Sequence, residues 1–141
     1  MSAIDIDPEI RYQNALQAYF GWLGASIGDV LDIIGSTPNI YDLIQETDGD
    51  LTLCFRGYRE EQYLRRVFAE YEAARNNYVD SIVSNDPRIL ELDREIEDFS
   101  VQHPHYLLDE RDILFDMLSE EARANERYHM TEELLRLFNL A

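Results

Sequence analysis

The sequence has no lysine, and its 12 cationic side chains are all arginine, against 29 aspartate and glutamate residues. The formal net charge is −17. Binding to a nucleic-acid backbone or to an anionic membrane surface depends on basic side chains, so this charge balance argues against both. The partner that it favours is a basic protein surface.

Other features are scarce or missing. The single cysteine, Cys54, excludes an internal disulfide and a zinc site built from several thiolates. No apolar run reaches the ~18 residues that a membrane span needs. The first ten residues, MSAIDIDPEI, are acidic and lack the basic and apolar regions of a secretory signal. We therefore expect a cytoplasmic protein.

Motifs for catalysis are also missing. The glycines of GWLGASIG (21–28) follow no predicted strand and lack the lysine of a phosphate-binding loop. Cys54 lies in an apolar setting, where a small buried thiol is the usual outcome. We expect a protein that is not an enzyme and carries no cofactor.

What the sequence does contain is strong helical punctuation. Asp7 and Asp86 each precede a proline, which is the pattern of an N-cap followed by proline at the first helical position. Apolar residues recur every three or four positions after both starts. The predicted fold class is all-α, a single compact bundle of five to seven helices in one domain over residues 1–141. The expected helices cover residues 6–24, 26–35, 37–47, 58–82, 85–99, 105–128 and 131–139.

One stretch departs from the helical pattern. In LTLCFR (51–56) apolar and polar residues alternate, which is the period of a strand. We predict a short extended segment near 50–56. It is a connector, half of a small hairpin, or an edge paired across a dimer.

Negative charge is concentrated in the second half of the chain, where residues 76–141 hold sixteen acids and six arginines. In the 105–128 helix, four carboxylates step by three, four and four residues. They share one face, and Leu107, Leu114, Met117 and Leu118 define the apolar face. The preceding helix has a similar row of three. The candidate partner-binding residues are Asp109, Asp112, Asp116, Glu120, Glu91, Glu95 and Asp98.

Rows of carboxylates at one helical turn, ~5.4 Å, are similar to a line of backbone phosphates. Both groups accept hydrogen bonds from arginine and lysine. Two rows on neighbouring helices would form a rigid two-row anionic face. The small size, acidity and helical content resemble those of phage-encoded DNA-mimic inhibitors, the anti-restriction and anti-CRISPR proteins. The resemblance implies an inhibitor that occupies the nucleic-acid-binding surface of a partner, and it transfers no residue roles.

Three alternatives stay open. In the first, the acidic rows are only a solvated surface. In the second, they are an adaptation to a cytoplasm of high salt. In both, the protein is a helical adaptor. Such an adaptor would form a homodimer through the 58–82 helix or the 50–56 segment. A metal-dependent helical-bundle enzyme is the third reading, based on the spacing of Glu126 with His129 and of Glu95 with Asp98.

Overall fold

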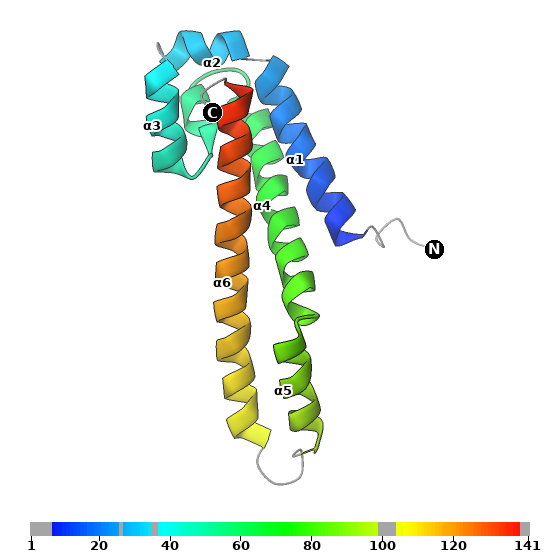
Figure 1. The fold of residues 1–141 in the computed structure, drawn as a ribbon. Helices are drawn as coiled ribbons and strands as arrows, with labels where there is room; N and C mark the ends of the chain where they lie inside the picture. The colour runs from blue at the N-terminus through cyan, green and yellow to red at the C-terminus, as the bar shows by residue number, and fades with distance from the viewer. Residues whose placement is uncertain (1–6, 26, 35–36, 99–103, 139–141) are drawn as a thin grey trace, which may run out of the picture.

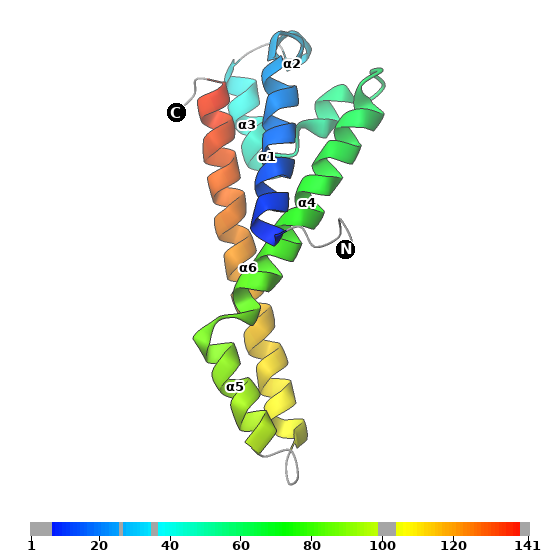
Figure 2. The same cartoon turned by 90° about the vertical axis from the view of Figure 1, so that its right-hand side faces the viewer.

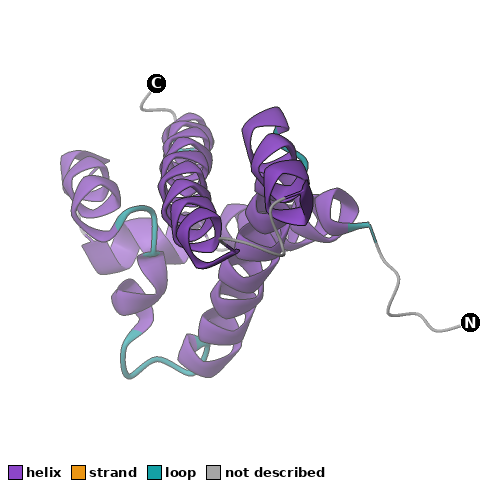
Figure 3. Ribbon diagram, turned by 90° about the horizontal axis from the view of Figure 1, so that it is seen from below, coloured by secondary structure: helices purple, strands orange, loops and turns teal. Residues whose placement is uncertain are grey.

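All secondary structure in the described part of the chain is helical. The structure, a computed structural model, describes residues 7–25, 27–34, 37–98 and 104–138, and no strand occurs within these ranges (Figures 1 and 3). The elements are α1 (Pro8–Ala25), α2 (Ile27–Ile34), α3 (Thr37–Thr47), the 3₁₀ helix η1 (Leu51–Phe55), α4 (Glu61–Ser84), α5 (Pro87–Asp98) and α6 (Pro104–Leu137). The predicted all-α class is confirmed. None of these described helices combines the length and the apolar character that a membrane span requires.

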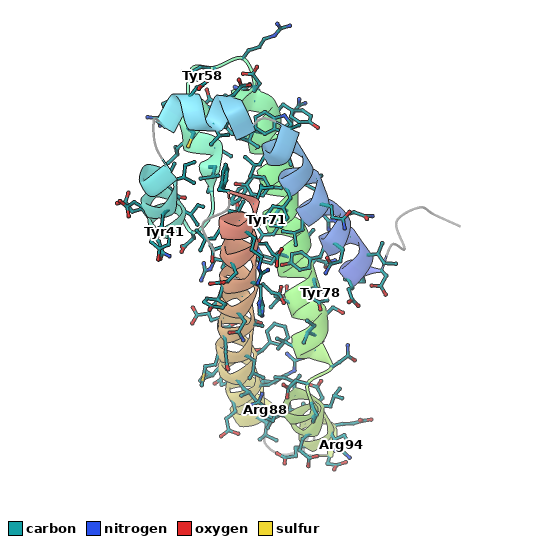
Figure 4. The ribbon with its side chains drawn as sticks, turned by 45° about the horizontal axis from the view of Figure 1, so that its top comes forward. Tyr41, Tyr58, Tyr71, Tyr78, Arg88 and Arg94 are labelled. Carbon is teal, nitrogen blue, oxygen red and sulfur yellow. The ribbon has the colours of Figure 1, made fainter. Side chains whose placement is uncertain are left out.

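The main core lies where α1, α4 and the C-terminal half of α6 pack along one another. Helices α2 and α3 and the 3₁₀ helix η1 close one end of this bundle (Figures 1 and 2). Aromatic rings fill its centre. The ring of Tyr19 contacts that of Phe68 edge to face, and the ring of Tyr12 stacks on that of Tyr78, with 5.1 Å between the ring centroids in each pair. Figure 4 shows Tyr71 between the helices, whereas Tyr41 and Tyr58 lie at the periphery. Burial of large side chains of this kind stabilises a fold by about 1.5–3 kcal/mol each.

Below the bundle, α5 and the first half of α6 form an antiparallel two-helix hairpin, which we call the arm (α5 and residues 104–122; Figure 2). With 34 residues, α6 is about 50 Å long at 1.5 Å per residue. The arm has its own small core, separate from that of the bundle. Its buried members are Val79, Val83, Ile89 and Leu118, against which Leu114, Phe115 and Ala122 pack.

Both predicted Asp–Pro helix starts are present. The Asp7 carboxylate accepts a hydrogen bond from the Glu9 amide at 2.8 Å, and Asp86 accepts one from the Arg88 amide at 2.8 Å. The Arg88 side chain also pairs with Asp86, and these hydrogen bonds lower the pKa of the Asp86 carboxyl. The second start separates α5 from α4. The helical segment is therefore broken at this point, whereas α6, which packs along both helices, is continuous.

The prediction of an extended segment near 50–56 is wrong, because residues 51–55 form a 3₁₀ helix. Asp50 caps it by accepting a hydrogen bond from the Thr52 amide at 2.9 Å. Leu51 and Phe55 are buried, but Leu53 is half exposed. Burial therefore follows a helical spacing, and the alternation of the sequence is incidental.

The predicted boundary at Thr131 is also wrong. The sequence predicts two helices, over residues 105–128 and 131–139, whereas α6 continues through this point. The Thr131 hydroxyl donates to the Tyr128 carbonyl at 2.8 Å, a bond within the helix that replaces the expected cap. Met130 and Leu134 on either side are buried in the main core. Consequently α6, and not the 58–82 helix, is the longest helix in the described ranges.

A turn at Gly49 joins α3 to η1 and is tied to α1. The Tyr19 hydroxyl donates to the Gly49 carbonyl at 2.6 Å and accepts from the Leu51 amide at 3.1 Å. Gly49 has a φ of +86°, and a Cβ there would lie 2.7 Å from the Met130 sulfur and closer still to its methyl carbon. The backbone conformation favours glycine at this position, and an added Cβ would also force the buried Met130 side chain to shift.

We expect Gly49→Ala to destabilise the protein by about 2–4 kcal/mol, through left-handed strain and overpacking against α6. Gly57→Ala is the matched control, because Gly57 has a φ of +82° and a Cβ added to it would meet no atom within 4 Å. It should cost only the strain, about 1–2 kcal/mol. Urea unfolding measures the free energy of unfolding of both variants. Equal losses of stability would show that the contact with Met130 is unimportant.

Candidate functional site

Four carboxylates form an exposed line along the arm portion of α6, which we call the acidic row (Asp109, Asp112, Asp116 and Glu120). None of the four takes part in an ion pair with another described residue. Successive members are one helical turn apart, about 5–6 Å. The predicted row therefore exists as a continuous anionic strip.

The acidic row faces away from α5. Leu114 and Leu118 mark the side of α6 that packs in the arm core. At about 100° per residue, Asp116 and Glu120 lie on the side of the helix opposite these leucines. A partner can thus approach the row without displacing α5.

The three carboxylates of α5 are placed differently. Glu91 and Asp98 are exposed and Glu95 is half-buried. Because Ile89 is buried towards α6, the same helical geometry turns this row to the outer side of α5. The two rows therefore face in opposite directions, and the expected two-row face does not form. Glu91 is also paired with Arg94.

Arginines pair with other carboxylates in and around the arm. Arg111 binds Asp93 at 2.5 Å and thereby links α6 to α5. Arg88 and Arg94 pair with acids two or three residues away on the chain. Exposed pairs of this kind stabilise a fold by less than about 1 kcal/mol each. Their effect here is mainly on charge distribution, since in the arm they compensate only Glu91 and Asp93. The acidic row is left without an ion pair among the described residues, as are five other arm carboxylates: Glu95, Glu97, Asp98, Glu110 and Glu121.

The residues of the proposed metal motif have other surroundings. Glu126 accepts a hydrogen bond from the Tyr12 hydroxyl at 2.8 Å, and His129 is exposed. Burial raises the pKa of Tyr12, and neighbouring Tyr71 and Glu126 raise it further. In the described ranges, no three His, Cys, Asp or Glu side chains gather to hold a metal ion. Glu126 thus belongs to a polar contact between α1 and α6.

Next to this contact, the Arg75 guanidinium lies 5.5 Å from the centroid of the Tyr71 ring. Arg75 is buried and donates to the side-chain oxygen of Asn76 at 3.3 Å. Contact with an aromatic face compensates part of the desolvation of a cation. Tyr71, Arg75 and Asn76 all lie on α4, and none of them lines the four hollows found among the described residues.

Sequence reasoning missed a second feature of α6, which we call the apolar stripe (Ile113, Met117, Ala124 and Tyr128). Ile113 and Met117 are each 61% exposed and Tyr128 is 62% exposed. The prediction that Met117 belongs to the apolar face with Leu114 and Leu118 is therefore wrong. The available signal was Ile113, which lies four residues before Met117 and outside the leucine face.

No protein-family model matches the sequence, and neither the curated proteins nor the solved structures contain a significant match. A function for the chain therefore has to be argued from its own surface.

Partial burial raises the pKa of the Cys54 thiol to about 11 from an ordinary value of 9.0. Only the thiolate is nucleophilic, so at pH 8.5 the folded protein holds roughly a hundredfold less of the reactive form than the unfolded chain. We expect alkylation by iodoacetamide to be at least tenfold slower in buffer than in urea. Equal rates, measured by mass spectrometry, would show that burial does not suppress the thiolate, and a faster rate in buffer than in urea would show an activated thiol and revive a catalytic reading of Cys54.

Proposed function

We propose that this protein is a non-enzymatic acidic binding protein that occupies a basic, nucleic-acid-binding surface of a partner, in the manner of a DNA-mimic inhibitor. The observation that carries the proposal is the acidic row on α6. Asp109, Asp112, Asp116 and Glu120 are exposed, regularly spaced and free of ion pairs among the described residues.

The rigidity of α6 supports this function. A helix holds its carboxylates in fixed positions, so a row of arginines or lysines on the partner could bind them with little loss of conformational freedom. The excess negative charge would accelerate the encounter with a basic surface and make the affinity depend on salt. These are the properties by which a protein competes with a nucleic acid.

The opposite directions of the two carboxylate rows favour a cleft over a flat surface. Two packed helices are roughly 20 Å across, from an interaxial distance of about 9 Å and a helix diameter of about 10 Å. An arm of this width with acids on both outer sides is shaped for a channel with basic walls. Channels that hold a nucleic-acid duplex have such walls.

A helical adaptor is the second candidate, and exposed aromatic residues near η1 favour it. Tyr58, Tyr63 and Leu53 are each about half exposed on or near η1 and α4. Light scattering would reveal the homodimer that this reading predicts. Adaptation to high salt would instead raise the melting temperature steeply towards molar salt.

To test the proposal, we would reverse two charges of the acidic row, Asp112→Arg with Asp116→Arg. A partner is first isolated from the native host on the wild-type protein, and its affinity is then measured with purified components at several salt concentrations. We expect at least a tenfold loss of affinity for the variant. Duplex DNA should displace the wild-type protein from its partner.

Asp42→Arg with Glu46→Arg is the matched control. These exposed residues of α3 have the same spacing of four, and neither is ion-paired within the described structure. The control has the same net charge as the test variant and should bind within about threefold of wild type. Equal losses in the two variants would indicate non-specific attraction, and a salt-insensitive partner would support the adaptor.

A further inference from the structure

The apolar stripe lies on one side of α6 and is bordered by carboxylates. Its members are separated by four, seven and four residues, which keeps them within an arc of roughly 60° at 3.6 residues per turn. By the same geometry, Asp116 and Glu120 border it on one side, and Glu110 and Glu121 border it on the other. All four carboxylates are exposed.

The apolar stripe and α3 lie on the same side of α6, with α3 nearer the C-terminal end of α6. Between α3 and α6 is a hollow of about 280 Å³, to which α3 and the following turn contribute Ile44 and Asp48. Ala124 and Tyr128, the upper half of the stripe, line the same hollow. Below the end of α3 at Thr47, Ile113 and Met117 remain exposed. Figure 1 shows that this flank of α6 has no neighbouring helix in the described chain.

We propose that the apolar stripe docks an amphipathic helix of the partner that has an apolar ridge flanked by lysine or arginine. This inference rests on the proposed function and specifies how the partner is held. Apolar residues separated by four and seven positions lie along one seam, against which a second helix can pack. The stripe is about 23 Å long at 1.5 Å per residue, which matches a partner helix of roughly 16 residues.

The charge around the stripe decides between a foreign helix and a second copy of this chain. A second copy would bring its own Glu120 and Glu121 against the same borders, and like charges in such a contact oppose association. A cationic helix would neutralise both borders while it covers Ile113 and Met117. Methionine and tyrosine suit such a contact, because they are enriched at the buried centres of interfaces.

The test uses the full-length protein and a labelled, designed 18-residue helical peptide with a leucine ridge and lysine flanks. Fluorescence anisotropy measures its affinity. A scrambled peptide of identical composition controls for charge alone, and a peptide with glutamate flanks controls for the apolar ridge alone. We expect the designed peptide to bind at least tenfold more tightly than either control.

Ile113→Ser with Met117→Ser should lower the affinity for the designed peptide at least tenfold. The matched control, Ile10→Ser with Tyr41→Ser, replaces side chains that are 56% and 44% exposed elsewhere and should leave the affinity unchanged. Circular dichroism confirms that each variant is folded. Equal affinity of the designed and scrambled peptides, or no effect of the Ile113 and Met117 changes, would overturn the docking site.

Failures of the two proposals give different results. If Asp112→Arg with Asp116→Arg abolishes partner binding but the stripe variant does not, the proposed function stands and the docking site is wrong. If the stripe variant weakens peptide binding but Asp112→Arg with Asp116→Arg leaves partner binding unchanged, the docking site stands and the acidic row does not recognise the partner. Dimerisation of the wild-type protein that Ile113→Ser with Met117→Ser abolishes would identify a second copy as the occupant.

Discussion

The structure depends on one unbroken helix that serves two cores. The upper half of α6 contributes Met130 and Leu134 to the main core, and its lower half contributes Leu118 to the core of the arm. The segment that packs along α6 is divided into two helices, α4 and α5. The division is at Asp86 and Pro87, where Asp86 caps the start of α5. Neither α1 nor α3 reaches the lower half of α6, so α5 and the C-terminal end of α4 pack on it there, and the hairpin extends as an arm.

Because only α5 and the C-terminal end of α4 cover the arm portion of α6, most of its circumference stays accessible. That circumference carries two different surfaces: the acidic row on the side away from α5 and the apolar stripe next to it. In the bundle, the same helix also contacts α1, α3 and α4, and fewer of its residues are exposed. The candidate binding surface is therefore a direct consequence of how the chain distributes packing partners along α6.

The sequence predicted local features well where a single side chain decides them. The caps at Asp7 and Asp86 follow from short-range chemistry and are confirmed. It failed where tertiary packing decides. Thr131 has the chemistry of a cap, but burial of Met130 and Leu134 keeps the helix continuous. The direction in which Met117 points, and the opposite directions of the two acidic rows, depend on which side of each helix finds a neighbour.

The free-energy cost of the acidic row, compared with the stability of a typical fold, shows which feature distinguishes a binding surface from one that only confers solubility. Like charges one turn apart cost about 0.2–0.5 kcal/mol per pair, so the acidic row costs about 1 kcal/mol against a typical stability of 5–15 kcal/mol. A fold tolerates such a row without any function, and the row alone would equally suit a solvated surface. Ile113 and Met117 do not fit that explanation, because a surface that only confers solubility gains nothing from large exposed apolar side chains. It is their position beside Asp116 and Glu120 on one rigid helix that favours recognition of a basic partner over solubility.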